Sequence, residues 1–216
     1  MIYLDHENLF DIIQNNLAQR KPTRLAHPKF KLAAVLIPII DSGGSTEFIF
    51  TVRTSKVQKH KGEISFPGGA FEEELDHSLQ ETAIREAKEE INLNPEQIQV
   101  LGELDDFCTM TGYIIHPVVA HVSPPYEYRL AKSEVAEIFT VPLDFFKNPT
   151  HFEERIINMG DWQYAVYYFK TKTHTIWGAT AHIVVNFFEA ALNFPMPATI
   201  RKRPSPEQLL ALKGKI

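Results

Sequence analysis

Hydrophobic residues recur at helical spacing near both ends of the chain. Leu9, Ile12, Ile13 and Leu17 follow one another at intervals that predict an amphipathic helix over about 6–19. Residues 178–193, GATAHIVVNFFEAALN, are apolar around much of a helical circumference, which predicts a second and well-buried helix. A short helix is also expected after Pro204.

Runs of β-branched and aromatic residues predict strands between these helices. KLAAVLIPII (31–40) and EFIFTVRT (47–54) are joined by DSGGS, which indicates a hairpin. Four more runs predict strands: QVLGELDDF (99–107), YIIHPVVAHV (113–122), DWQYAVYYFK (161–170) and THTIW (173–177). The chain has no internal repeat and no linker-like change of composition, so we expect a single α/β domain over 1–216.

Composition narrows the class of protein. The 216 residues are 44% hydrophobic and 23% charged, which is typical of a globular chain with a sizeable core. A net charge of −5 argues against general binding to nucleic acid or to anionic membranes. The N-terminus lacks the features of a secretory signal, no apolar run is long enough to span a membrane, and the single cysteine rules out an internal disulfide. These features predict a cytoplasmic protein.

A further helix is predicted over about 79–91. Ser78 and Glu81 have the spacing of a capping box, and Asn92 suits the left-handed conformation that often ends a helix. Its buried stripe is expected to comprise Leu79, Ala83, Ala87, Ile91 and Ile84.

Three glutamates near the end of this helix run against local preference. Glu86 and Glu90 are about 40° apart around the axis, and Glu89 lies about 60° from Glu86 on the other side. Carboxylates are unfavourable near a helix C-terminus, and like charges four residues apart weaken a helix by about 0.2–0.5 kcal/mol. One interpretation is a solvated charged face, with Arg85 pairing to Glu81 or Glu89. The other is a site for a divalent cation, since Mg²⁺ prefers oxygen ligands.

The stretch GGAFEEELDHSLQETAIREAKEEINL (68–93) resembles the Nudix box, whose core is Arg-Glu-hydrophobic-x-Glu-Glu-x-Gly-hydrophobic. The resemblance implies a Nudix-type α/β/α sandwich around a mixed β-sheet, and an enzyme that hydrolyses nucleoside diphosphates linked to another group. It also implies Mg²⁺ or Mn²⁺ as cofactor, with Glu86, Glu90 and Glu89 as metal ligands. Glu86, Glu90 and Arg85 are then the expected catalytic residues, Arg85 by orienting the carboxylates.

Two positions depart from the family pattern. Asn92 replaces the glycine after the glutamates, a mild change because both residues accept positive φ. His77 stands where the family usually has a glutamate eight residues before the arginine, and the loop from Gly69 is longer than usual. Asp76 or one of Glu72, Glu73 and Glu74 is a candidate for the missing role.

The segment RTSKVQKHKGEISFPGG (53–69) is similar to the signature of the coenzyme A diphosphatase branch of that family. Val57, Gln58 and Glu63 depart from that signature, and two later segments, 134–143 and 176–183, also resemble the branch. Arginine and lysine suit phosphate recognition, and glycines allow backbone to approach phosphates. The substrate-binding residues predicted from this segment are Arg53, His60, Lys61, Gly62, Gly68 and Gly69.

The favoured function is metal-dependent hydrolysis of coenzyme A or acyl-CoA to 3′,5′-ADP and (acyl-)4′-phosphopantetheine. The alternatives are a Nudix hydrolase of ADP-ribose, a dinucleotide or a nucleoside triphosphate, and a catalytically silent nucleotide-binding domain. The general base stays open between Glu86, Glu134 and Glu137. The expected partner is the small-molecule substrate, with no nucleic acid or membrane, and the protein is expected to be a monomer or a homodimer.

Overall fold

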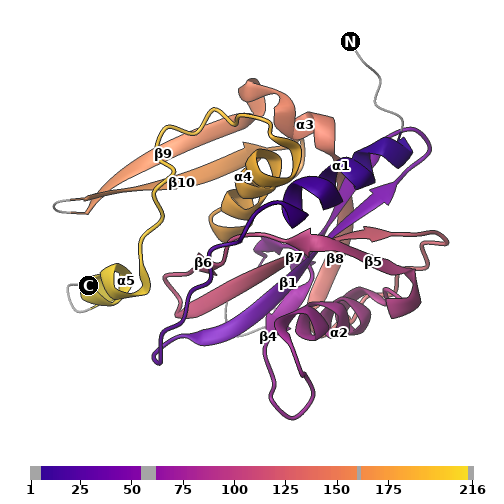
Figure 1. Ribbon diagram of the computed structural model, residues 1–216, viewed down its shortest axis with the longest axis horizontal. Helices are drawn as coiled ribbons and strands as arrows, with labels where there is room; N and C mark the ends of the chain where they lie inside the picture. The colour runs from indigo at the N-terminus through magenta and orange to yellow at the C-terminus, as the bar shows by residue number, and fades with distance from the viewer. Residues whose placement is uncertain (1–5, 55–61, 160–161, 214–216) are drawn as a thin grey trace.

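The computed structural model describes residues 6–54, 62–159 and 162–213, and its largest element is a mixed sheet (Figure 1). The central strands β1 (Lys31–Asp41) and β7 (Tyr113–Val122) run parallel, within the order β3–β2–β1–β7–β5. The other strands of this sheet are β2 (Thr46–Arg53), β3 (Ile64–Ser65), β4 (Gly68–Ala70), β5 (Ile98–Glu103), β6 (Phe107–Cys108) and β8 (Val135–Pro142). The predicted hairpin is confirmed, because β1 and β2 pair antiparallel with Ile39 opposite Phe48.

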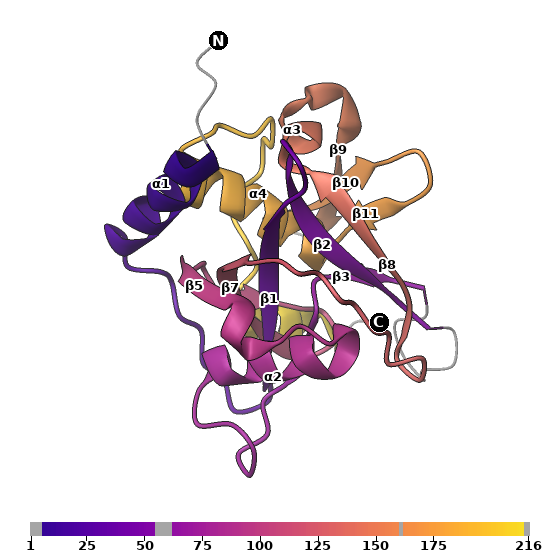
Figure 2. The same ribbon diagram turned by 90° about the vertical axis from the view of Figure 1, so that its right-hand side faces the viewer.

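Helices cover both faces of this sheet (Figure 2). Successive side chains of β1 point to opposite faces, so Leu36 packs against α2 (Leu79–Ile91) while Ile37 packs on the side of α1 (His6–Ala18) and α4 (Ala179–Leu192). The α/β/α sandwich around a mixed sheet is thereby confirmed. The helices predicted over 6–19, 79–91 and 178–193 differ from the observed ones by at most one residue at each end.

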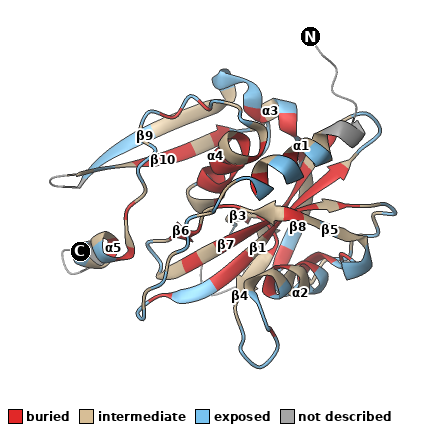
Figure 3. Cartoon of the chain, in the orientation of Figure 1, coloured by how far each residue is buried: buried red, intermediate tan, exposed pale blue. Residues whose placement is uncertain are grey.

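A second, antiparallel sheet lies beyond α4. It contains β9 (Phe152–Met159), β10 (Trp162–Lys170) and β11 (Thr175–Trp177) in the order β11–β10–β9. Buried residues line α4 and the strands on both sides of it (Figure 3). The ring of Phe48 on β2 lies 4.9 Å from that of Phe187 on α4, and Phe146 in α3 (Leu143–Lys147) reaches Phe169 of β10 at 5.0 Å. Aromatic packing therefore joins the two sheets through α3 and α4.

Several strand assignments differ from the sequence prediction. The run 99–107 is split into β5 and β6, because the side chains of Asp105 and Asp106 accept hydrogen bonds from the backbone N–H groups of Thr23 and Leu25. The strands β3, β4, β8 and β9 were not predicted. The first two are only two and three residues long. In β8 and β9 polar or exposed residues interrupt the apolar ones, so both lack the continuous apolar runs that mark the central strands.

The remaining described elements are short. They are the 3₁₀ turns Pro95–Gln97 and Pro149–His151 and the terminal helix α5 (Pro206–Lys213), which confirms the helix predicted after Pro204. Among the described residues, no helix is long and apolar enough to cross a membrane.

Candidate active site

The ends of α2 are fixed as the sequence predicts. The Ser78 hydroxyl accepts a hydrogen bond from the backbone N–H of Glu81 at 3.2 Å, and the Glu81 carboxylate accepts one from the N–H of His77 at 2.8 Å. Asn92 adopts φ 60°, and its N–H reaches the last carbonyl groups of the helix. These caps fix the positions of the glutamates that follow along α2.

Glu90 lies inside the apolar stripe of α2 and not at its edge. It follows Ala83 by seven residues, which places it about 20° from Ala83 around the axis. Its residue exposure is only 2%, and its carboxylate accepts a hydrogen bond from the Gly68 N–H at 3.2 Å, with Arg53 Nη1 3.6 Å away. Burial raises the pKa of Glu90 to about 7, against the opposing influence of Gly68 and Arg53. Gly68 and Arg53 therefore only partly stabilise a negative charge on Glu90.

Glu86 lies beside Glu90 and faces β4. A Cβ added at Gly69 would come within 2.3 Å of the Glu86 carboxylate, so the glycine leaves the space that this side chain occupies. Burial raises the pKa of Glu86, Arg85 lowers it, and Glu89 and Glu134 raise it further by repulsion. The negative charge of Glu86 also raises the pKa of Glu90. The two carboxylates therefore form one electrostatically coupled pair.

Arg85 is held by three carboxylates and by the Ala70 carbonyl. Its Nε and Nη2 form a two-pronged contact with Asp76 at 2.8 and 3.0 Å, and Nη1 lies 2.9 Å from Glu86 and 3.2 Å from Glu89. The Arg85 guanidinium holds the pKa of Asp76 at about 2. Arg85 is thus a positioning residue for Glu86. Asp76, one of the residues proposed to compensate for His77, holds the Arg85 guanidinium in this position.

Glu89 shares the Arg85 Nη1 group with Glu86, but it is much more exposed than Glu86 or Glu90. Its side chain is 57% exposed and its described contact is the ion pair with Arg85. Within the described ranges, no three His, Cys, Asp or Glu side chains are arranged to hold a metal ion. The donor chemistry still fits a divalent cation, because Glu86 and Glu90 are neighbouring hard-oxygen ligands with incompletely compensated charge. Water and substrate phosphate commonly complete the coordination of Mg²⁺.

Of the downstream acids, Glu134 is close enough to raise the pKa of both Glu86 and Glu90. Its carbonyl accepts a hydrogen bond from the Thr54 N–H, which places it next to Arg53 at the end of β2. Glu137 instead pairs with His174 at 3.3 Å. The structure therefore brings Glu134, and not Glu137, into the electrostatic surroundings of the pair.

The glycines of β4 have steric roles that the sequence did not reveal. A Cβ at Gly68 would lie 2.3 Å from the Ala34 carbonyl oxygen and 2.7 Å from the Val35 Cα, so this position must stay small for β4 to pair with β1. Gly69 leaves room for Glu86, as described above. Both glycines also line a cavity on the other side of β4.

The segment 53–61, called the basic segment below because five of its nine residues are Arg, Lys or His, begins at this cavity. Arg53 lines it. The Arg53 N–H donates a hydrogen bond to the Glu63 carbonyl at 2.9 Å, and the Arg53 carbonyl accepts one from the Gly62 N–H at 3.0 Å. Gly62 has φ 69°, which favours glycine in this turn. His60 and Lys61, both predicted to bind substrate, lie outside the described residues.

The cavity has a volume of about 780 Å³ and lies between the two sheets. Strands β1, β4 and β7 contribute to one wall, and β9, β10 and β11 contribute to the other. Arg53 and Glu63 are its charged lining residues among those described. Its size suits a small organic ligand, and Gly68 and Gly69 link it to the carboxylates of α2.

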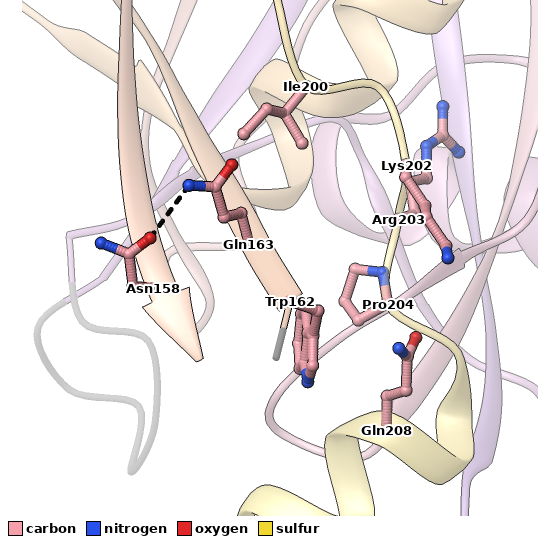
Figure 4. Close-up of a pocket in the computed structure, with 8 residues that line it drawn as sticks. All are labelled: Asn158, Trp162, Gln163, Ile200, Lys202, Arg203, Pro204 and Gln208. Carbon is pink, nitrogen blue, oxygen red and sulfur yellow. Dashed lines mark hydrogen bonds between the residues drawn. The ribbon is translucent and has the colours of Figure 1, made fainter. Parts of the chain in front are cut away.

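A second cavity, of about 560 Å³, lies between the β9–β10 hairpin and the segment before α5 (Figure 4). Lys202, Arg203 and Pro204 lie across from Trp162 and Gln163, whose amide donates a hydrogen bond to Asn158 at 3.0 Å. The two cavities share Trp162 and no other described lining residue. None of the predicted site residues lines this second cavity.

Comparison with known proteins agrees with this geometry. Residues 29–163 match the model of the NUDIX domain. The chain is 35% identical over 176 residues to the uncharacterized Nudix hydrolase NudL of Pectobacterium atrosepticum, an alignment covering 82% of this chain and 91% of that one. It is 31% identical over 169 residues to the peroxisomal coenzyme A diphosphatase NUDT7 of Mus musculus, covering 76% of this chain and 71% of that one.

A solved structure shares the overall fold. The MutT/nudix family protein from Enterococcus faecalis superposes with a TM-score of 0.52 over 96% of this chain and 77% of that one, at 13% sequence identity. At this low identity the similarity concerns the fold alone.

Proposed function

The chain belongs to the Nudix family of hydrolases, and we propose that it hydrolyses the pyrophosphate bond of coenzyme A or of its acyl thioesters. The observation that carries the proposal is the position of Arg53, which lines the cavity while its guanidinium lies 3.6 Å from Glu90. A pyrophosphate bound to Arg53 is thus next to the coupled carboxylates. Similarity to a coenzyme A diphosphatase over three quarters of the chain supports this substrate among those of the family.

In the proposed mechanism, Glu86 and Glu90 hold a divalent cation, Mg²⁺ or Mn²⁺, with Glu89 as a further ligand. When bound, such a cation lowers the pKa of water and neutralises phosphate charge. Arg85, fixed by Asp76, keeps the Glu86 carboxylate in place. Arg53 stabilises the charge that develops on the pyrophosphate during attack.

The reaction adds one water across one phosphoric anhydride bond. The water oxygen forms a bond to one phosphorus, and the bond from that phosphorus to the bridging oxygen breaks. We assign the removal of the water proton to Glu134, because it is exposed and adjoins the carboxylate pair. The bridging oxygen leaves with the other phosphate, giving 3′,5′-ADP and 4′-phosphopantetheine or its acyl derivative.

Recognition of the nucleotide end is assigned to the basic segment. The 3′-phosphate of coenzyme A is an anion that ADP-ribose lacks, and His60 and Lys61 lie in the segment that starts at Arg53. Gly62, Gly68 and Gly69 allow backbone to approach the phosphates. We further propose that residues 1–216 form one Nudix domain, acting as a monomer or a homodimer.

The test is hydrolysis by the purified protein with Mg²⁺ or Mn²⁺. Coenzyme A is compared with dephospho-coenzyme A, ADP-ribose and a nucleoside triphosphate, with Glu90→Gln as the inactive control. We expect coenzyme A to be turned over fastest, dephospho-coenzyme A at least tenfold more slowly, and the variant to lose about 100- to 1,000-fold in kcat.

The possible outcomes separate the alternatives. Preferred turnover of ADP-ribose or a triphosphate, still abolished in Glu90→Gln, would contradict the coenzyme A assignment and retain the carboxylate site. Nucleotide binding without turnover of any substrate would favour a catalytically silent domain.

A further inference from the structure

The second cavity, of about 560 Å³, has no acidic residue among its described lining side chains (Figure 4). Its polar and aromatic lining consists of three carboxamides, one indole and two cations: Asn158, Gln163, Gln208, Trp162, Lys202 and Arg203. The chain as a whole has a net charge of −5, whereas this lining carries two positive charges. The cavity therefore favours an anionic ligand.

The two cations of this cavity follow an arginine that has a structural role. Arg201 pairs with Glu189 at 2.8 Å and donates hydrogen bonds to two backbone carbonyl groups. Among the described residues, no carboxylate lies within ion-pair distance of Lys202 or Arg203. The segment thus brings to the cavity two positive charges that the described part of the fold leaves without an acidic partner.

Arg203 is partly buried, which makes the missing counter-charge costly. The described contacts of its guanidinium are the Asp106 carbonyl at 3.4 Å and the ring of Phe107, whose centroid is 5.7 Å away. Burial lowers the pKa of Arg203, and the more distant Asp105 only partly opposes this. An anion bound in the cavity would supply the negative charge that this guanidinium lacks.

The carboxamides of the cavity keep polar atoms available for a ligand. Gln163 Nε2 donates to Asn158 Oδ1 at 3.0 Å, so the Gln163 oxygen and the Asn158 nitrogen are the remaining polar atoms of this pair. Gln208 Oε1 accepts from the Ser205 N–H at 2.9 Å, and its amide nitrogen remains. Carboxamides can donate to and accept from the edge of a purine, and an indole such as Trp162 can stack on a base.

We propose that the second cavity binds a nucleoside monophosphate, with the phosphate at Lys202 and Arg203 and the base at Trp162 and the carboxamides. The volume of about 560 Å³ suits a ligand of this size. The two cavities share only Trp162 among their described lining residues, so this site is separate from Arg53 and from the carboxylates of α2. The proposal is independent of which substrate is hydrolysed there.

Two lysines provide a matched pair for testing this assignment. Lys202 and Lys172 are both exposed, and Lys172 lies in the turn between β10 and β11. Lys202 lines the second cavity, whereas Lys172 lines neither cavity. Substitution by glutamine removes one positive charge from each, but only Lys202→Gln removes it from the proposed phosphate site.

The experiment is isothermal titration calorimetry of AMP into the wild type, Lys202→Gln, Lys172→Gln and Arg53→Gln. We expect the wild type to bind AMP with a Kd below about 1 mM. Lys202→Gln should weaken binding by about three- to tenfold, because it removes a charge-assisted contact with the phosphate. Lys172→Gln and Arg53→Gln should stay within about twofold of the wild type, since their charges lie outside the site.

Fluorescence tests the position of the base. The chain has two tryptophans, so Trp177→Phe leaves Trp162 as the sole one. Stacking of adenine on Trp162 should quench its emission as AMP is added, and the quenching should be weakened by Lys202→Gln. Adenosine and inorganic phosphate, titrated separately, should each bind more weakly than AMP, because each has only one of the two groups.

Three results would overturn the proposal. The first is absence of AMP binding by the wild type. The second is loss of AMP binding in Arg53→Gln with Lys202→Gln unchanged, which would place the nucleotide in the first cavity. The third is inorganic phosphate binding as tightly as AMP with no quenching of Trp162, which would leave an anion site without a base. Because no result depends on hydrolysis of coenzyme A, failure of this proposal and failure of the proposed function are distinguishable.

Discussion

Helices α2 and α4 pack on opposite faces of the large sheet, and they differ in how well their buried polar side chains are hydrogen-bonded. In α4 the Thr180 hydroxyl donates to the Ile64 carbonyl at 2.8 Å, and His182 Nε2 lies 2.8 Å from the Ala165 carbonyl. Asn186 exchanges hydrogen bonds with Asp105 through its amide oxygen and nitrogen. Each polar side chain buried in α4 therefore has a protein partner, as expected of a helix that serves the fold.

The buried polar side chain of α2 that differs from this pattern is Glu90. Its carboxylate has one amide donor at 3.2 Å and a guanidinium at 3.6 Å, and Glu86 beside it adds repulsion. Burial of a carboxylate with so little compensation costs stability. The polar residues of α4 therefore support the fold, whereas the poorly compensated Glu90 of α2 is what we expect of a residue that serves binding and chemistry.

The largest expected effect concerns His182 in α4. Burial lowers its pKa to about 4, whereas in the unfolded chain it takes up a proton near 6.5. Between these values the unfolded state binds more protons, so the contribution of His182 to stability is lost as the pH falls from about 6.5 to 4. The loss reaches about 3 kcal/mol, at 1.36 kcal/mol per pKa unit.

The measurement is chemical unfolding of the wild type and His182→Gln at pH 7.5, 6, 5 and 4.5. The difference between the two proteins should shift in favour of the variant as the pH falls, because glutamine does not titrate. A difference that stays constant with pH would show that His182 is not held neutral by burial.

A second prediction concerns the two glycines of β4, of which one leaves space for the β1 backbone and the other for the Glu86 carboxylate. Gly68→Ala forces a Cβ against the β1 backbone and should lower the free energy of unfolding by about 1–3 kcal/mol. Gly69→Ala meets the movable end of Glu86 and should change stability by less than about 1 kcal/mol. Because it displaces a carboxylate, it should lower kcat by about 10- to 100-fold.

Unfolding curves and initial rates on both variants check this prediction. If Gly69→Ala were the less stable variant and retained full activity, the position of Glu86 against β4 would have no role in catalysis.

The smallest expected effect is that of Glu89→Gln on stability. Glu89 is exposed and pairs with Arg85, and such surface pairs contribute about 0–1 kcal/mol. Thermal unfolding should therefore place this variant close to the wild type. A large destabilisation would mean that Glu89, like Asp76, is required to position Arg85.

Much of the fold was predictable because local signals agree with the global structure. The capping residues Ser78 and Asn92 and the continuous apolar runs of β1 and β7 fix their elements without tertiary information. The strands β8 and β9 were missed because their side chains are largely polar or exposed. The pairing of β8 depends on β2, which lies far away in the sequence, whereas β9 pairs with its neighbour β10 in a hairpin.

The sequence predicted which residues form the candidate site better than it predicted how they are arranged. The resemblance of 68–93 to the family motif identifies Glu86 and Glu90, and the seven-residue spacing from Ala83 to Glu90 could have shown that Glu90 is buried. The ion pair between Arg85 and the exposed Glu89 is one of the two pairings that the i,i+4 spacing offered. The Asp76–Arg85 pair depends on the loop after β4, which has no periodic signal.

The central claim is that Glu90 is retained for binding a cation and weakens the metal-free fold. Its pKa is raised from 4.5 to about 7, so its unfavourable contribution appears as the pH rises through this range and is fully present above about 7. At pH 8 without metal, Glu90→Gln should therefore be more stable than the wild type by about 1–3 kcal/mol.

Thermal unfolding at pH 8, with and without Mn²⁺, tests this claim most directly. Mn²⁺ should raise the Tm of the wild type and leave that of Glu90→Gln nearly unchanged, because only a folded state that binds the ion is stabilised by it. A Glu90→Gln variant that is less stable than the wild type without metal, and is stabilised equally by Mn²⁺, would contradict the account.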